Sequence, residues 1–127
     1  MAQPAASSPQ FRITTDRARR LIRYKLTGLW DIETFARYER AMDAEIRSLQ
    51  AMGLSFDMIG DLTNFPTQPQ FLNELRQEMI RKAKAKGLRK CAIIATSSLV
   101  KLQVGRLSDA SYAFFSSENE AENWLKS

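Results

Sequence analysis

Apolar and polar residues alternate along two short segments near the start of the chain. Residues 11–15 read Phe-Arg-Ile-Thr-Thr, and residues 22–26 read Ile-Arg-Tyr-Lys-Leu. A period of two is typical of a strand that is buried on one face only. The link between the two segments, residues 16–20, is short and polar, so an antiparallel hairpin is the simplest connection.

Three longer segments carry apolar residues at helical spacing, which predicts amphipathic helices. The first follows Asp31, a predicted N-cap, and ends at Gly53; the second runs from residues 67–69 to Gly87; the third follows Ser117. The side chains expected on their buried faces are Ile32, Phe35, Met42, Ile46 and Leu49; then Phe71 or Leu72, Leu75, Met79 and Ala83; then Ala121, Trp124 and Leu125. A shorter, less regular helix is expected to carry Leu99, Leu102 and Leu107.

Short apolar strands are predicted between these helices, at residues 56–62, 91–95 and 112–115. Residues 91–95 have no polar face, which is typical of a central parallel strand covered by helices on both sides. Ile93 and Ile94 should therefore be buried on opposite faces of the sheet. Cys91 lies in the same strand, and a single cysteine in this setting is expected to be a small buried side chain.

The resulting order of elements is ββαβαβαβα, which predicts the α/β class. We expect a single-domain mixed β-sheet, with an N-terminal antiparallel hairpin followed by βαβ units, and helices on its faces. Residues 1–10 are rich in Ala, Ser and Pro and are expected to form a flexible tail, with residues 11–127 forming the domain. The tail lacks the features of a signal peptide, and no apolar run is long enough to span a membrane, so we expect a cytoplasmic protein.

The composition narrows the chemistry. The chain has no histidine and one cysteine, which removes the commonest general base and the commonest nitrogen ligand for metals. We therefore expect no catalytic residue, no cofactor and no metal site. The net charge of +5 comes largely from two basic clusters, at residues 17–25 and 81–90. They lack the aromatic residues that stack bases, so specific nucleic-acid binding is not expected.

The candidate binding surface is the turn that follows the strand at residues 56–62. Polar side chains gather there at the start of the next helix, and those after residues 91–95 should lie beside them. The predicted site residues are Asp61, Thr63, Asn64, Phe65 and Thr67, with Thr96, Ser97 and Ser98. The simpler alternative is that the polar residues only close turns and cap helices.

Phe65 is the residue of this turn that suggests a partner. It stands between Asn64 and Pro66 and belongs to neither of the flanking periodic patterns. An exposed aromatic side chain there would be an anchor for a protein partner. The competing account is that Phe65 turns inward and caps the core.

Four segments together resemble the STAS superfamily of anti-sigma-factor antagonist-like domains, and its SpoIIAA-like bacterial branch in particular. They are Leu26-Thr-Gly-Leu-Trp-Asp31, Met58-Ile-Gly-Asp-Leu-Thr-Asn-Phe65, Lys90-Cys-Ala-Ile-Ile-Ala95 and Phe114-Phe-Ser-Ser-Glu-Asn-Glu-Ala-Glu-Asn-Trp-Leu125. The resemblance covers nearly the whole chain after the tail. It implies a non-catalytic regulatory module with a protein partner at the turn after the third strand, and a homodimer stays open.

Two further functions remain alternatives. SpoIIAA-like domains are similar in fold to lipid-carrying CRAL-TRIO domains, which implies a carrier of a small apolar or lipid-like ligand. Weak nucleic-acid binding through the basic clusters is the second alternative. The phosphorylated members of the superfamily carry an Asp-Ser-Ser-Gly-like turn, whereas this chain reads Asp61-Leu-Thr-Asn64. Thr63 is an imperfect substitute for the serine that accepts phosphate.

Overall fold

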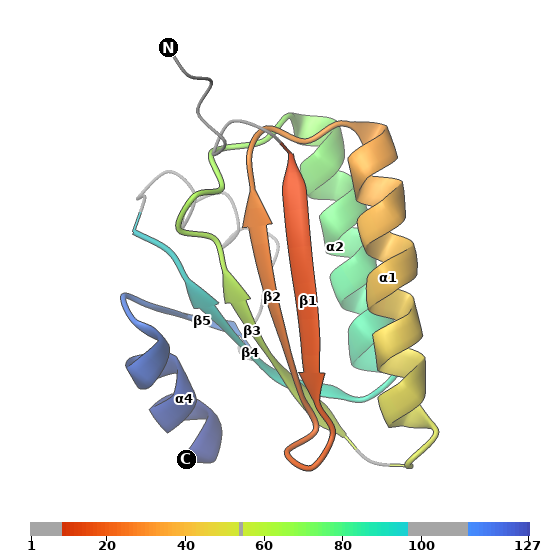
Figure 1. Cartoon of the computed structure of the whole chain (residues 1–127), viewed down its shortest axis with the longest axis vertical. Coiled ribbons are helices and arrows are strands. Elements are labelled where there is room, and N and C mark those ends of the chain that lie inside the picture. The colour runs from red at the N-terminus through yellow and green to blue at the C-terminus, as the bar shows by residue number, and fades with distance from the viewer. Residues whose placement is uncertain (1–8, 54, 97–111) are drawn as a thin grey trace.

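The computed structural model of the chain describes residues 9–53, 55–96 and 112–127, and shows a mixed sheet with helices on both faces (Figure 1). The strands are β1 (Gln10–Asp16), β2 (Leu21–Thr27), β3 (Phe56–Asp61), β4 (Leu88–Ile94) and β5 (Tyr112–Phe115). The helices are α1 (Ile32–Gln50), α2 (Gln70–Ala85) and α4 (Glu118–Lys126). The elements follow the predicted order. The predicted helix with Leu99, Leu102 and Leu107 lies outside the described residues.

The five strands lie side by side in the order β1-β2-β3-β4-β5. β1 and β2 form the expected antiparallel hairpin, and β3, β4 and β5 continue the sheet in parallel. This confirms the predicted α/β class and the mixed sheet. The sequence left the strand order open, and the structure shows that it follows the chain.

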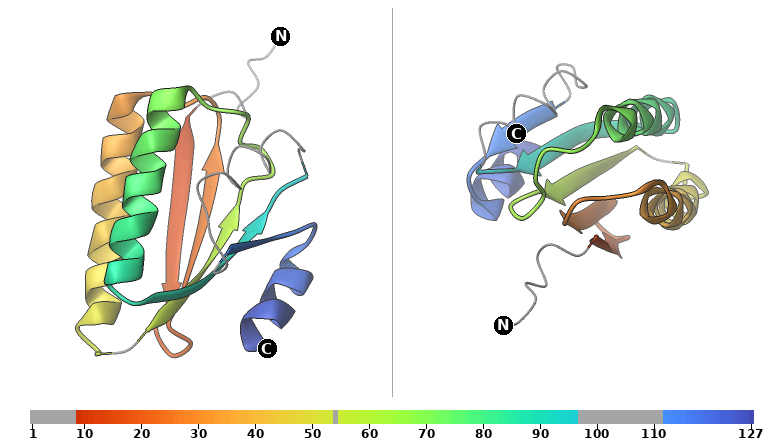
Figure 2. Two further views of the ribbon diagram at one scale, coloured as in Figure 1. Left: turned by 180° about the vertical axis from the view of Figure 1, so that it is seen from behind. Right: turned by 90° about the horizontal axis from the view of Figure 1, so that it is seen from above.

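Each face of the sheet has its own core. α1 and α2 run side by side over one face, and α4 covers part of the other (Figure 2). Ile93 belongs to the core under α1 and α2, whereas Ile94 belongs to the core under α4. Both are buried, which confirms their predicted placement on opposite faces.

The helix ends follow from local chemistry. The Asp31 carboxylate accepts a hydrogen bond from the Thr34 amide at 2.8 Å, which caps α1 as predicted. Ser117 caps α4 in the same way, and the Glu120 side chain reaches back to the Ser116 amide. Gly53 follows α1 with φ of 74°, a backbone conformation that glycine adopts without a steric penalty.

Two predicted buried faces were partly wrong. Ile32 is 62% exposed because it lies in the first turn of α1, at the edge of the sheet. In α2 the buried residues are Leu72, Asn73, Arg76 and Ala83, whereas Phe71 and Leu75 are exposed. The helix is thus rotated from the apolar pattern, and it turns an arginine towards the sheet.

Candidate functional site

The carboxyl ends of β2, β3 and β4 lie at one edge of the sheet, together with the amino ends of α1 and α2 (Figure 1). We call this the edge surface; it comprises residues 28–32, 61–71 and 95–96. Open α/β sheets commonly place their ligand or partner sites at this edge. The predicted site therefore falls on one continuous part of the fold.

Gln68 holds the two loops of the edge surface together. Its side chain is 5% exposed; Nε2 donates to the carbonyl oxygens of Gly28 at 3.0 Å and Pro66 at 2.8 Å. Its Oε1 accepts from the Trp30 amide at 2.9 Å. One side chain thus satisfies three backbone groups across the β2–α1 and β3–α2 connections. The sequence does not reveal this role, because glutamine in a polar loop is usually exposed.

Asp61 and Thr63 close their own turn. Asp61 Oδ1 accepts from the Thr63 amide at 2.9 Å and from the Thr63 hydroxyl at 2.6 Å. Lys25 Nζ lies 4.0 Å from the other carboxylate oxygen of Asp61. The turn-closing role of these two residues, the simpler of the two explanations, is therefore present. The Thr63 hydroxyl is exposed at the surface while it makes this bond.

The other polar residues of the predicted site are exposed on the same edge. Asn64 and Thr67 lie in the β3–α2 connection, and the Leu62 amide donates to the Ile94 carbonyl at 2.8 Å. That bond aligns the ends of β3 and β4, so exposed Thr96 follows at the same edge. Ser97 and Ser98 lie outside the described residues.

Phe65 is buried, so its predicted role as an exposed anchor was wrong. It is 3% exposed, and its ring packs edge to face on Trp30 at 5.7 Å between centroids. The guanidinium of Arg76 lies over the ring, 5.2 Å from its centroid. The competing account, that Phe65 turns inward and caps the core, is confirmed. Burying its large apolar area outweighs any preference for the loop surface.

Other apolar side chains are exposed on the edge surface. They are Leu29 at 57%, Ile32 at 62% and Phe71 at 42%. The sequence pattern placed Ile32 in the core and indicated neither Leu29 nor an exposed Phe71. Helical spacing masked Ile32 and Phe71, since a periodic pattern does not show which end of a helix is left uncovered. Leu29 precedes the helix and belongs to no periodic pattern. Met52, at the other end of α1, is also exposed.

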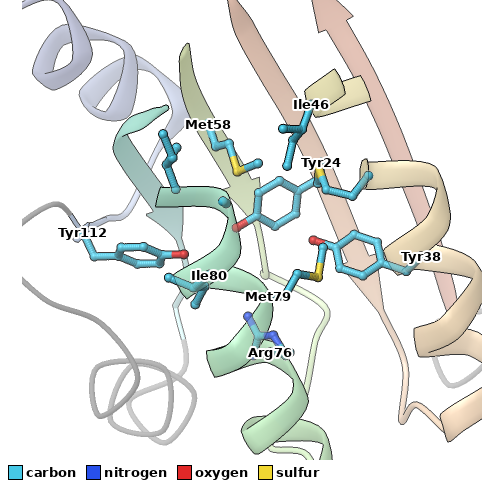
Figure 3. A pocket seen from close by; sticks show the side chains of 11 residues that line it. Tyr24, Tyr38, Ile46, Met58, Arg76, Met79, Ile80 and Tyr112 are labelled. Atoms are coloured by element: carbon cyan, nitrogen blue, oxygen red, sulfur yellow. The ribbon is translucent and has the colours of Figure 1, made fainter. Parts of the chain in front are cut away.

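A cavity of about 30 Å³ lies between the sheet and the pair α1 and α2 (Figure 3). Its walls are mostly apolar, with four polar side chains among them: Tyr24, Tyr38, Arg76 and Tyr112. Figure 3 shows the hydroxyl ends of the tyrosines turned towards the middle of this space. None of these four side chains was predicted from the sequence as a site residue.

Tyr24 lies flat across β3 because Gly60 leaves room for its ring. A Cβ at position 60 would fall 2.3 Å from the ring's Cζ atom, far inside van der Waals contact. The Tyr24 hydroxyl lies 3.6 Å from the thiol of Cys91, with which it hydrogen-bonds. Burial raises the pKa of the Cys91 thiol to about 11, so the thiol stays protonated, as expected of a buried cysteine.

A larger groove of about 380 Å³ runs between α1 and α2 on the outside of the cavity. The cavity and the groove share four wall residues, which are Met42, Ile46, Met79 and Ala83. Lys86 of the α2 C-cap donates to Asp43 of α1 at 2.7 Å across the groove. Two flexible methionine side chains thus belong to the partition between the groove and the cavity.

Several cations of the two basic clusters are paired with acidic groups. Arg19 and Arg23 form ion pairs with Glu122 of α4, and Arg23 also contacts Glu118. In the second cluster, Arg89 pairs with Asp57 at 2.7 Å, and Arg81 pairs with Glu78. Paired cations have less charge to offer a phosphate backbone.

The described part of the chain contains no group of three Cys, Asp or Glu side chains placed to hold a metal ion. Asp57 and Asp61 serve different partners, Arg89 and Thr63 respectively. Within the same residues, no helix is long and apolar enough to cross a membrane.

The chain matches no known family model and no curated protein sequence. Solved structures do match it. A DUF3478-family protein of unknown function from Shewanella loihica PV-4, described as having a SpoIIAA-like fold, superposes with a TM-score of 0.70 at 16% identity, over 97% of this chain and 99% of the other. The chain has this fold. An anti-sigma factor antagonist from Mycobacterium paratuberculosis superposes with a TM-score of 0.66 at 14% identity, over 100% of both chains. The SpoIIAA-like resemblance seen in the sequence is confirmed at the level of the fold.

Proposed function

We propose that the protein is a non-catalytic regulatory module that binds a protein partner through the edge surface. The likeness in fold to an anti-sigma factor antagonist supports a regulatory role. The residue content supports a binding role over catalysis, because the edge surface offers turn-closing hydroxyls and carboxylates but no histidine or thiol. Binding at this surface requires only shape and apolar contact.

The exposed apolar side chains Leu29, Ile32 and Phe71 are the observation that carries the proposal. Apolar residues gathered on a surface commonly mark an interaction site. Gln68 holds the loops beneath them through three backbone hydrogen bonds. A surface that is already ordered loses less conformational entropy on binding, which favours its use for recognition.

The test compares the two ends of the layer formed by α1 and α2. Leu29→Glu and Phe71→Glu each place a charge on the edge surface, whereas Met52→Glu places one at the opposite end, on another exposed apolar residue. A partner is captured from lysate with the wild-type protein, identified and purified, and its affinity for each variant is measured. We expect the edge variants to weaken binding about tenfold or more, and Met52→Glu to bind like the wild type.

Melting curves of each variant accompany the binding measurement, since all three positions are exposed and folding should be preserved. If Met52→Glu weakens binding as much as the edge variants do, the partner does not use the edge surface. If Leu29→Glu and Phe71→Glu leave the affinity unchanged in folded protein, the proposal is wrong.

The two alternatives have less support. A lipid tail needs a mostly apolar pocket of roughly 300 Å³ or more, whereas the cavity measures about 30 Å³. The groove of about 380 Å³ beside it is open to solvent and is crossed by the Lys86–Asp43 ion pair. Nucleic-acid binding has less support because Arg19, Arg23 and Arg89 are already paired with carboxylates. Protein binding at the edge surface is therefore the function that we propose.

A further inference from the structure

Arg76 is a largely buried cation without an acidic partner among the described residues. Its residue is 8% exposed, and its guanidinium packs over the ring of Phe65. Among residues 9–53, 55–96 and 112–127, no carboxylate or carbonyl oxygen accepts a hydrogen bond from it. Its guanidinium donors are therefore left for water or for a bound anion. The described cations Arg19, Arg23 and Arg89 all have a carboxylate partner.

The surroundings of Arg76 are suited to an anion. Its side chain lines the cavity together with Tyr24, Tyr38 and Tyr112 (Figure 3). Burial raises the pKa of each of these three phenols. All three therefore keep their protons at neutral pH and can donate hydrogen bonds. A guanidinium and three hydroxyl groups converge on one space.

The remaining walls suit hydrocarbon. They are formed by side chains such as Met58, Met79, Ile80 and Leu88. An inorganic oxyanion such as phosphate needs polar partners on every side, and these walls supply none. A carboxylic acid has one charged end and one apolar end, which matches the division of the cavity. Guanidinium also binds carboxylate in a planar, two-point geometry.

We propose that this cavity binds a short-chain monocarboxylate, with its carboxylate on Arg76 and the tyrosine hydroxyls and its carbon chain against the methionine and aliphatic walls. A volume of about 30 Å³ is close to the share of one water molecule, so even acetate enters only when the flexible methionine walls move aside. Longer acids, such as butyrate, extend towards the groove by displacing Met42 and Met79, which line both spaces.

The fluorescence of Trp30 should report carboxylate binding in the cavity. Arg76 stacks on Phe65, and Phe65 packs on Trp30, so a ligand that draws the guanidinium changes the environment of the indole. The chain has two tryptophans, and Trp124 lies on the other face of the sheet. A Trp124→Phe background leaves Trp30 as the single tryptophan, which can be excited selectively over the tyrosines.

The experiment titrates the Trp124→Phe protein with sodium acetate and sodium butyrate at pH 7 and constant ionic strength. Sodium chloride and sodium phosphate serve as anion controls. We expect saturable changes in Trp30 fluorescence with the carboxylates only, and calorimetry with the unaltered protein should give the same affinities. No saturation with either carboxylate overturns the proposal. Saturation by chloride or phosphate with equal affinity overturns the choice of carboxylate.

Variants identify the binding group. Arg76→Met keeps an unbranched, flexible side chain and removes the charge, and it should weaken butyrate binding about tenfold or more. Arg81→Met is the matched control, because Arg81 lies on the exposed face of the same helix, paired with Glu78. It should bind butyrate like the wild type. Equal affinities for Arg76→Met and the wild type contradict the proposal.

Tyr38→Phe keeps the test decisive if Arg76→Met fails to fold. It removes one hydroxyl from the cavity and leaves the ring that packs on Trp30. We expect butyrate affinity to fall several-fold with an unchanged melting temperature. An unchanged affinity in this folded variant counts against the tyrosine cluster as the carboxylate site. These readouts do not involve a protein partner, so they succeed or fail independently of the proposed function.

Discussion

The two faces of the sheet differ in whether their buried and half-buried cations are paired with carboxylates. Beneath α4, Arg19 and Arg23 meet the carboxylate of Glu122, and Lys90 lies over the ring of Trp124 with its ammonium bonded to backbone oxygens. Beneath α1 and α2, Arg76 stacks on Phe65 and has no acidic partner among the described residues. The first arrangement fastens a helix to the sheet. The second leaves donors available for something else.

The apolar cores differ in the same sense. The α4 face is small and made largely of aliphatic side chains, whereas the α1 and α2 face is large and rich in aromatic rings and methionine. Flexible and bulky side chains leave irregular spaces more readily than branched aliphatic ones. The cavity and its polar lining occur on the aromatic face. One face thus mainly supports the fold, and the other holds the cavity for which we propose a ligand.

The largest effect is expected where the two faces meet. Ile93 and Ile94 are adjacent in β4, and each belongs to a different core. Ile93→Asp and Ile94→Asp should each abolish cooperative unfolding, because each buries an unpaired charge. Ile93→Val, the conservative control, should cost about 0.5–1.5 kcal/mol. Denaturant melts make the comparison, and a soluble Ile94→Asp protein with a near-normal transition would contradict the assignment of the α4 core.

A smaller loss is expected at the loop that closes the aromatic face. Phe65→Ala removes a buried ring from between Trp30 and Arg76, which should cost about 3–5 kcal/mol. Phe71→Ala is the matched control, since Phe71 is exposed nearby and should change stability by about 0.5 kcal/mol or less. Equal losses for the two variants in urea melts would show that Phe65 is not part of the core.

The smallest effect concerns the ion pairs of the α4 face. The hydrogen bond from Arg19 is the main reason that the pKa of Glu122 falls from its ordinary value of 4.5 to about 2, and Arg23 adds to it. A carboxylate with a lowered pKa stabilises the fold above the unfolded-state pKa and loses that contribution as the pH falls from about 4.5 to about 2. Glu122→Gln should therefore cost about 1 kcal/mol at pH 7.

The pH dependence separates this ion pair from simple packing. The difference in stability between the wild type and Glu122→Gln should shrink below pH 4.5 and nearly vanish at pH 2. Glu118→Gln is the control, because Glu118 is more exposed and should matter less. A difference that stays constant from pH 7 to pH 2 would mean that charge plays no part.

The fold could be predicted because its signals are local. Alternation marked β1 and β2, Asp31 and Ser117 marked helix starts, and the apolar run at residues 91–95 placed Ile93 and Ile94 on opposite faces. Each of these signals depends on neighbours within a few residues. The strand order depends on longer connections, and the sequence left it open.

The candidate site was harder to predict because its key residues act over distance. Gln68 joins two loops that are 40 residues apart at Gly28, and no local pattern records that bond. Arg76 packs on the Phe65 ring and lines the cavity, and these contacts bury it. An arginine within a helical pattern is normally assigned to the surface. The sequence marked Phe65 as unusual, but whether its ring points inwards or outwards depends on its contact with Trp30, 35 residues earlier in the chain.

Position 60 offers a way to recognise this cavity in other chains. The ring of Tyr24 occupies the space that any Cβ at residue 60 would need, so the two positions cannot vary independently. A related chain with alanine or valine at position 60 must have a smaller or differently oriented side chain at position 24, its pairing partner in β2. A phenol at position 24 would then no longer reach the cavity. Glycine at position 60 together with tyrosine at position 24 therefore indicates the polar lining of this cavity. The pair can be looked for in distant relatives even where the rest of the sequence has diverged.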